Sequence, residues 1–208
     1  LMAYQLSGNL NDGVLNMLNA KYILYENKQG DNVAERNPNA LGNAWFVNNV
    51  SFVKGAAEEM KSLFHFNSKD SAHISPTEIA YVDEQYKSAV GSFVTRDSNS
   101  IITMNSFDND AITYKSKTAV NQIVVFSEIY YKDWKAYIDG KPADYFKANY
   151  VLRGMNIPSG EHTIEFKFEP KAFFIGDKIG RICSWITALL LVALLARIFL
   201  KKNKHTLT

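Results

Sequence analysis

The sequence predicts a mainly β protein: an antiparallel β-sandwich, preceded by a small mixed α/β part and followed by one C-terminal transmembrane helix. Three observations carry this prediction. Short segments between residues 101 and 169 alternate apolar and polar side chains, as half-buried strands do. Residues 123–126 are apolar at every position, which indicates a central strand covered on both faces. Residues 182–196 contain no charged side chain, which is typical of a helix in lipid.

Residues 1–92 are predicted to form the mixed α/β part. Val14, Leu15 and Leu18 fall at helical spacing and predict a short helix over residues 11–19. Residues 27–41 are polar and rich in Gly, Asn and Pro, so we expect a loop there. Four strands are expected, at residues 21–25, 44–47, 51–53 and 76–82.

A second helix is predicted in this part, over residues 56–66. Its sequence is amphipathic, and the spacing places Met60, Leu63 and Phe64 on the buried side.

Residues 93–172 are predicted to form the sandwich. Its strands are expected at residues 101–104, 111–116, 123–126, 134–138, 150–157 and 161–169. Asp139-Gly140 indicates a tight hairpin, because both central residues of a type I′ turn take positive φ. In the last strand His162, Ile164 and Phe166 share one face, and Pro170 ends the strand.

Residues 173–200 are predicted to hold a membrane junction and the transmembrane helix. The apolar run 182–200 would extend roughly 28 Å as a helix, enough for the hydrocarbon core of a bilayer. Arg197 lies close enough to its end to reach the headgroups, and Asp177 can pair with Arg181 one turn away. A buried core helix is the alternative, but the run is apolar on all sides.

Charge and cysteine content exclude several classes of protein. Of 23 Lys and Arg, six lie at or after residue 177, together with one of 21 acids, so residues 1–176 carry a net charge of −3. Without a basic face on the body we expect no nucleic-acid partner. Cys183 stands alone, so no intramolecular disulfide can form. The chain opens on Leu1 without a signal segment, and we expect it to be a piece of a longer protein.

No sequence motif for catalysis, cofactor binding or metal binding is found. Walker, GxGxxG, HExxH and GxSxG patterns are missing from the sequence. His162 shares a face with apolar residues and is expected to be a satisfied core or edge histidine. Glu128, Asp133 and Asp139 could form a paired-carboxylate site, but charged residues at strand ends are usually solvated. We therefore predict no catalytic, cofactor or metal residue in this chain.

Aromatic residues are concentrated near the end of the predicted sandwich. Twelve lie between residues 126 and 174, and at ~150–250 Å² each they are too many to be exposed together. Most must be core, or must lie against lipid. Tyr130, Tyr131 and Tyr145 are the candidates for an exposed sugar-stacking platform, and Asp133 completes the set of candidate glycan contacts.

The same region resembles a known family. Residues 127–141 read SEIYYKDWKAYIDGK, which is similar to the pattern S-x-x-Y-Y-P-G-W-x-x-x-(I/V)-D-G, with Lys132-Asp133 where Pro-Gly is usual. Further matching segments are Asn149-Tyr150, Arg153-Gly154 and residues 158–164, 168–170, 15–23 and 37–47. The set resembles the C-terminal end of the YfhO-type bacterial membrane proteins.

The resemblance implies a polytopic glycosyltransferase of the GT-C type in the bacterial cytoplasmic membrane. Such proteins take sugar from a polyprenyl-phosphate donor and transfer it to a cell-envelope glycan or polymer. Their catalytic acids lie in an early outer loop, so the resemblance assigns no catalytic residue and no cofactor to this chain. Its expected partners are the lipid bilayer, the rest of the polytopic chain and the envelope acceptor.

The resemblance also implies an orientation, with the body extracytoplasmic (periplasmic). The basic tail, residues 201–208, is expected to be cytoplasmic, as its three lysines also indicate. Two alternatives stay open: a non-catalytic envelope binding or assembly module, and a tail-anchored cytosolic hydrolase using His162 and nearby acids.

Overall fold

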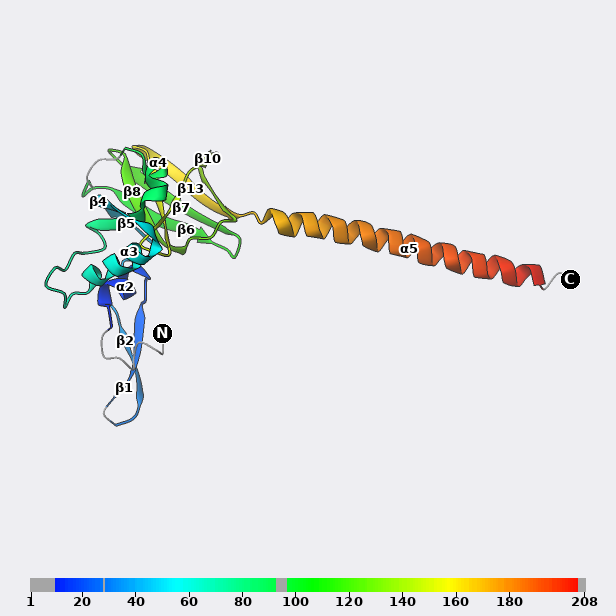
Figure 1. The fold of residues 1–208 in the computed structure, drawn as a ribbon, viewed down its shortest axis with the longest axis horizontal. Coiled ribbons are helices and arrows are strands. Elements are labelled where there is room, and N and C mark those ends of the chain that lie inside the picture. Colours follow the sequence, from blue (N-terminus) through cyan, green and yellow to red (C-terminus); the bar gives the residue numbers. More distant parts are fainter. Residues whose placement is uncertain (1–9, 28, 93–96, 206–208) are drawn as a thin grey trace. The chain divides into compact units, whose positions relative to one another are not determined.

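The structure is a computed structural model that describes residues 10–27, 29–92 and 97–205, with side chains up to residue 197 (Figure 1). The chain divides into two compact units, Leu1–Phe168 and Glu169–Thr208.

The first unit is built on two antiparallel sheets, which confirms the predicted β-sandwich. The five-stranded sheet has the order β10-β9-β13-β7-β6, with bounds Lys141–Ala143, Trp134–Ile138, Gly160–Phe168, Ala111–Thr118 and Ile101–Phe107. The four-stranded sheet has the order β11-β12-β8-β3, with bounds Phe146–Ala148, Leu152–Ile157, Gln122–Ile129 and Ala44–Val47.

An aromatic core joins the two sheets. The ring of Phe126 on β8 meets Tyr114 on β7 and Phe166 on β13 edge to face, with centroids 4.8 and 5.0 Å apart. Ile112 and Ile164 are buried around them, as the alternating pattern of β7 and β13 predicts. Edge-to-face contact is the favoured geometry for aromatic pairs, so this cluster fixes the distance and orientation of the sheets.

The four-stranded sheet is covered on both faces. On β8, Val124 and Phe126 belong to the core between the sheets, while Ile123 and Val125 belong to a second core on the opposite face. The prediction of a strand covered on both faces is therefore confirmed. The second core also contains Trp45 and other residues of the N-terminal part, so that part forms a third layer.

The third layer contains short helices and a parallel strand pair. Its elements are α2 Asp12–Met17, β4 Asn49–Val53, α3 Gly55–Ser62, η1 Leu63–Phe66, β5 Ile79–Asp83, η2 Glu84–Tyr86 and α4 Lys87–Val90. β4 and β5 pair in parallel. Asn149 closes this layer against the sandwich: its backbone N–H donates to the Tyr81 carbonyl at 2.7 Å, and its Oδ1 accepts from the Tyr81 N–H at 2.9 Å.

Two predictions for the N-terminal part are wrong. Residues 27–41 are not all loop, because β2 (Asn32–Arg36) pairs antiparallel with β1 (Tyr22–Glu26) in a two-stranded ribbon. Met60 and Phe64 are not buried: they are 51% and 62% exposed. The helix changes to a 3₁₀ turn after Ser62, which alters the angular spacing of the side chains that follow.

A buried carboxylate takes the inward position on α3. Glu59 is fully buried, and its Oε2 lies 2.8 Å from the Lys147 ammonium on β11. Its Oε1 accepts the backbone N–H of Tyr150 at 2.8 Å. This carboxylate therefore joins α3 to the four-stranded sheet.

The second unit is a single helix, α5 (Lys171–His205), which begins directly after Pro170. Its stretch Lys171–Arg197 is long and apolar enough to cross a membrane, and none of it is buried in the protein. Asp177 and Arg181 form the expected ion pair, with Oδ2 and Nη2 2.8 Å apart. These features agree with the predicted transmembrane helix.

Removal of the Glu59 carboxylate is expected to destabilise the first unit strongly. Glu59→Ala leaves the Lys147 ammonium and the Tyr150 N–H without their acceptor, which costs about 3–5 kcal/mol in the free energy of unfolding. Denaturant unfolding of the detergent-solubilised chain measures this change. Glu161→Ala, which breaks the exposed Lys117–Glu161 pair, is the matched control and should leave the midpoint nearly unchanged. Equal midpoints for the two variants would contradict this role of Glu59.

Candidate functional site

Two of the four candidate glycan contacts, Tyr130 and Tyr145, line one hollow of about 440 Å³. Tyr130 follows β8, and Tyr145 lies between β10 and β11. The complete lining consists of Tyr130, Lys132, Trp134, Lys135, Ala136, Tyr137, Pro142, Ala143, Asp144 and Tyr145. We call this space the tyrosine hollow. Its wall is aromatic, and lysine and aspartate side chains supply polar groups.

Ring contacts hold the wall of the tyrosine hollow in place. The rings of Tyr130 and Tyr145 lie 5.2 Å apart at 46°, and Tyr86 from η2 meets Tyr130 edge to face at 5.9 Å. On its other side Tyr145 contacts Phe166 of the sandwich core, at 5.7 Å. The wall is thus continuous with the core, and its rings are positioned before any ligand binds.

The Tyr145 hydroxyl fixes the turn that leads into β9. Its Oη lies 3.0 Å from the carbonyl oxygens of both Tyr131 and Trp134, so it can donate to either. The N–H of Trp134 donates to the Tyr131 carbonyl at 3.2 Å. This turn contains Lys132-Asp133, where the family pattern has Pro-Gly, and the tyrosine holds it without those residues.

The other two candidates, Tyr131 and Asp133, do not line the hollow. Tyr131 is half exposed and packs against Phe168, with ring centroids 6.1 Å apart. Asp133 is partly buried in the same turn. The structure therefore brings Tyr130 and Tyr145 together, and glycan contact by any of the four stays a prediction.

Arg153 lies behind the hollow and was not singled out as a site residue from the sequence. It is 2% exposed, and its guanidinium stacks 4.2 Å from the ring centroid of Trp134 and 5.0 Å from that of Phe166. Its Nε donates to the Ile129 carbonyl at 3.0 Å. Burial lowers the pKa of Arg153, and the nearby Glu128 opposes that shift. A buried cation between two rings is stabilised by cation–π attraction, so Arg153 orients Trp134.

Burial raises the pKa of two phenols in this region, Tyr145 and Tyr86. It raises the pKa of Tyr145 to about 12, and the neighbouring Tyr130 adds to the shift. Burial together with a hydrogen bond to Tyr130 raises the pKa of Tyr86 as well. At neutral pH these groups stack and donate hydrogen bonds, and they do not act as phenolate bases.

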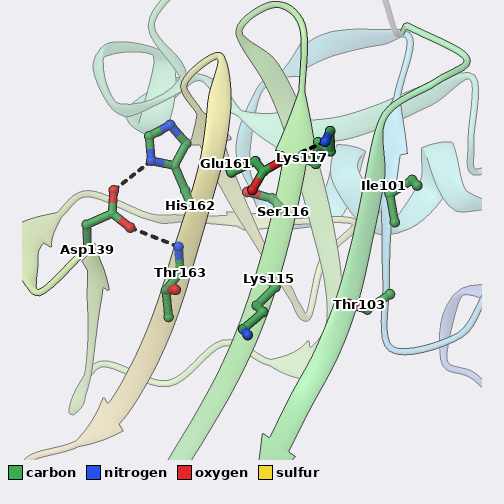
Figure 2. Close-up of a pocket in the computed structure, with 9 residues that line it drawn as sticks. All are labelled: Ile101, Thr103, Lys115, Ser116, Lys117, Asp139, Glu161, His162 and Thr163. Atoms are coloured by element: carbon green, nitrogen blue, oxygen red, sulfur yellow. Dashed lines mark hydrogen bonds and ion pairs between the residues drawn. The ribbon is translucent and has the colours of Figure 1, made fainter.

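A second hollow, of about 460 Å³, lies on the outer face of the five-stranded sheet (Figure 2). At its margin the Asp139 Oδ2 lies 2.6 Å from His162 Nδ1, while Oδ1 accepts the Thr163 N–H at 2.9 Å. His162 Nε2 lies 3.1 Å from the Ser159 carbonyl. A carbonyl oxygen only accepts, so Nε2 must donate to it.

Both ring nitrogens of His162 are therefore occupied, as expected for a satisfied edge histidine. A histidine in this arrangement has no free lone pair for general-base chemistry. Among the residues that the structure describes, no group of three His, Cys, Asp or Glu side chains could hold a metal ion.

The hairpin beside this histidine has the predicted geometry. Asp139 and Gly140 take φ of 51° and 75°, as a type I′ turn requires.

The segments that resemble the family meet in space. Ser127 Oγ donates to the Met17 carbonyl at 2.5 Å, which ties the end of α2 to β8. Asn19 donates to Asn43 at 2.9 Å, so residues 15–23 and 37–47 are joined as well. A Cβ on Gly154 would lie 2.3 Å from the Phe146 ring, which explains a glycine there.

Together, these features define a protein with a β-sandwich unit and a helix that is long and apolar enough to span a bilayer. The family model of the bacterial membrane protein YfhO matches residues 21–180, which is 160 of the 208 residues. The chain belongs to this family, as its motifs predicted. No curated protein and no solved structure matches it.

The Asp139–His162 pair makes stability depend on pH. The hydrogen bond with Asp139 raises the pKa of His162 above the ordinary 6.5. The pair therefore stabilises the folded chain fully below pH 6.5, and this stabilisation is lost as the pH rises through the raised pKa of His162. The pKa of Asp139 is lowered from 3.8, so its share is lost only in acid, as the pH falls through the lowered pKa. We therefore expect the denaturant concentration at the unfolding midpoint to decrease as the pH is raised from 6 to 9.

Asp139→Asn is the test of this dependence, because asparagine also tolerates positive φ. The variant should have a lower midpoint at pH 6 and little further loss by pH 9. An unchanged slope in the variant would show that other groups set the pH dependence.

Proposed function

We propose that this chain is the C-terminal extracytoplasmic domain and last membrane helix of a polytopic glycosyltransferase. The enzyme would use a polyprenyl-phosphate sugar donor and modify a cell-envelope glycan or polymer, with this domain gripping the acceptor. The observation that carries the proposal is the tyrosine hollow. Membership of the YfhO family supports the membrane setting.

The chemistry of the hollow suits a sugar. Pyranose rings present C–H faces that pack on aromatic rings, and Tyr130 and Tyr145 supply such rings. Lys132, Lys135 and Asp144 are exposed beside them and can bond ring hydroxyls or substituents. A volume of about 440 Å³ lies in the usual range of small-molecule sites.

The same geometry supports a binding role for this domain, with the chemistry elsewhere in the enzyme. The phenols stay protonated, and His162 has both nitrogens bonded. In this proposal, proton transfer and charge stabilisation come from other parts of the polytopic chain. This also argues against a hydrolase based on His162.

A second candidate function is a non-catalytic binding or assembly module for an envelope protein. The two-stranded β1-β2 ribbon (Figure 1) favours it. Its Tyr22 and Leu24 side chains are 65% and 64% exposed. Isolated ribbons of this kind are marginally stable in water and gain from a covering partner.

Truncation of a wall tyrosine is expected to weaken glycan binding. Tyr130→Ala removes one stacking ring, and a loss of roughly tenfold or more in affinity is expected for an aromatic anchor. Calorimetry or saturation-transfer NMR would measure it, with the detergent-solubilised chain and a panel of soluble oligosaccharides released from bacterial envelopes. Tyr131→Ala is the matched control, because this neighbouring ring lies outside the hollow. Equal affinities of the wild type and Tyr130→Ala for every ligand would refute the proposed site.

The proposed orientation is tested by labelling intact cells with an impermeant thiol reagent. In a Cys183→Ser background, a cysteine replacing the exposed Lys141 of β10 should react. A cysteine replacing Lys204 in the basic tail should react only after the membrane is permeabilised. The reverse pattern would place the sandwich in the cytoplasm and exclude the proposed function.

A further inference from the structure

One edge of the five-stranded sheet is open. β6 is the last strand of this sheet, and in the described part of the chain it pairs only with β7. Figure 2 shows Ile101 and Thr103 on this strand, beyond Lys115 of β7. The backbone N–H and C=O groups on the outer side of an edge strand are a template for pairing with another strand.

The two edges of this sheet differ in their protection. β10, at the other end, has three residues, and two of them are Lys141 and Pro142, the residue types that usually block pairing. β6 has seven residues, IITMNSF, with no charge and no proline. Its Ile101 and Phe107 are 57% and 60% exposed. Only the β10 edge therefore carries side chains that oppose strand addition.

We propose that β6 pairs with β6 of a second copy of this chain, so that the two five-stranded sheets join into one continuous antiparallel sheet. The pairing is centred on Thr103, which lies opposite the partner's Thr103. Ile102 then lies opposite the partner's Met104. The two copies are then related by a two-fold axis perpendicular to the sheet, so the same sheet face points outward in both. In such a pair, residues that lie directly opposite each other project from the same face of the sheet.

Three observations favour a second copy as the occupant. An uncharged strand can oppose itself without like charges meeting, and the Ile102–Met104 pair buries apolar surface. The ladder between β6 and β7 shifts between Met104 and Ser106, so a centre at Thr103 keeps the pairing in the regular part of the strand. In addition, α5 can confine all copies to one membrane, which raises their effective concentration.

A charge swap at Thr103 tests this pairing. Thr103 is exposed, so Thr103→Lys should preserve the fold while placing two ammonium groups, one from each copy, opposite each other. Within one copy the residue at 103 lies opposite Lys115 of β7, which repels a lysine and attracts a glutamate. We expect the dissociation constant of the dimer to rise roughly two- to fivefold for Thr103→Lys. The rise should be smaller for Thr103→Glu, because Lys115 offsets part of the glutamate charge. Mixing the two variants should restore the wild-type affinity or exceed it. Analytical ultracentrifugation of the 208-residue chain in detergent measures the homodimers, and energy transfer between labelled variants measures the mixture.

A disulfide provides the second measurement. Directly opposed residues have Cα atoms about 4.5–5.5 Å apart, which a disulfide can bridge. Thr103→Cys in a Cys183→Ser background should therefore form a covalent dimer on mild oxidation. Lys141→Cys, on the protected edge, is the matched control and should form no covalent dimer under the same oxidation.

Three results would overturn the proposal. The first is a monomer at all concentrations without a Thr103→Cys disulfide. The second is a dimer that neither Thr103→Lys nor Thr103→Glu weakens, which would place the contact elsewhere, such as on α5. The third is a failure of the mixed variants to associate, which would exclude self-pairing at Thr103.

Discussion

The rest of the structure depends on one constraint: the four-stranded sheet is apolar on both faces, so both faces must be covered. On β8 four consecutive buried residues alternate between two cores. The five-stranded sheet covers one face, and the helices with the β4-β5 pair cover the other. The Glu59–Lys147 ion pair and the bonds between Asn149 and Tyr81 supply the polar contacts of this second interface. The N-terminal part and the sandwich are therefore one packed unit.

The residues that carry the family resemblance mainly hold the layers of the first unit together and fix the wall of the tyrosine hollow. Trp134 stacks on the buried Arg153, Asp139 holds His162, and Ser127 ties β8 to α2. Each of these three side chains is engaged in a contact within the protein. The pattern therefore specifies a scaffold that presents aromatic rings and polar groups around one hollow.

Sequence reasoning succeeded where the signal is local. The buried β8 strand, the Asp139-Gly140 turn and the long apolar helix each follow from periodicity or turn chemistry. It failed for β2, because backbone pairing with β1 holds that strand and its polar side chains give no periodic signal. It also failed for the buried side of this segment, because a buried ion pair with Lys147 holds Glu59 inward and the 3₁₀ turn after Ser62 directs Phe64 outward. The hollow was only partly predicted, because its wall depends on Tyr86 and Arg153, which are distant from Tyr130 in sequence.

The strand order separates two surfaces of the five-stranded sheet. β9 and β10, at one end, provide part of the lining of the tyrosine hollow, including Ala136 and Pro142. β6 lies at the other end, with β7 and β13 between. Joining two copies through β6 would therefore leave both hollows uncovered. The protected β10 edge opposes strand addition beside the hollow, so the same sheet can associate at one end and leave the tyrosine hollow open at the other.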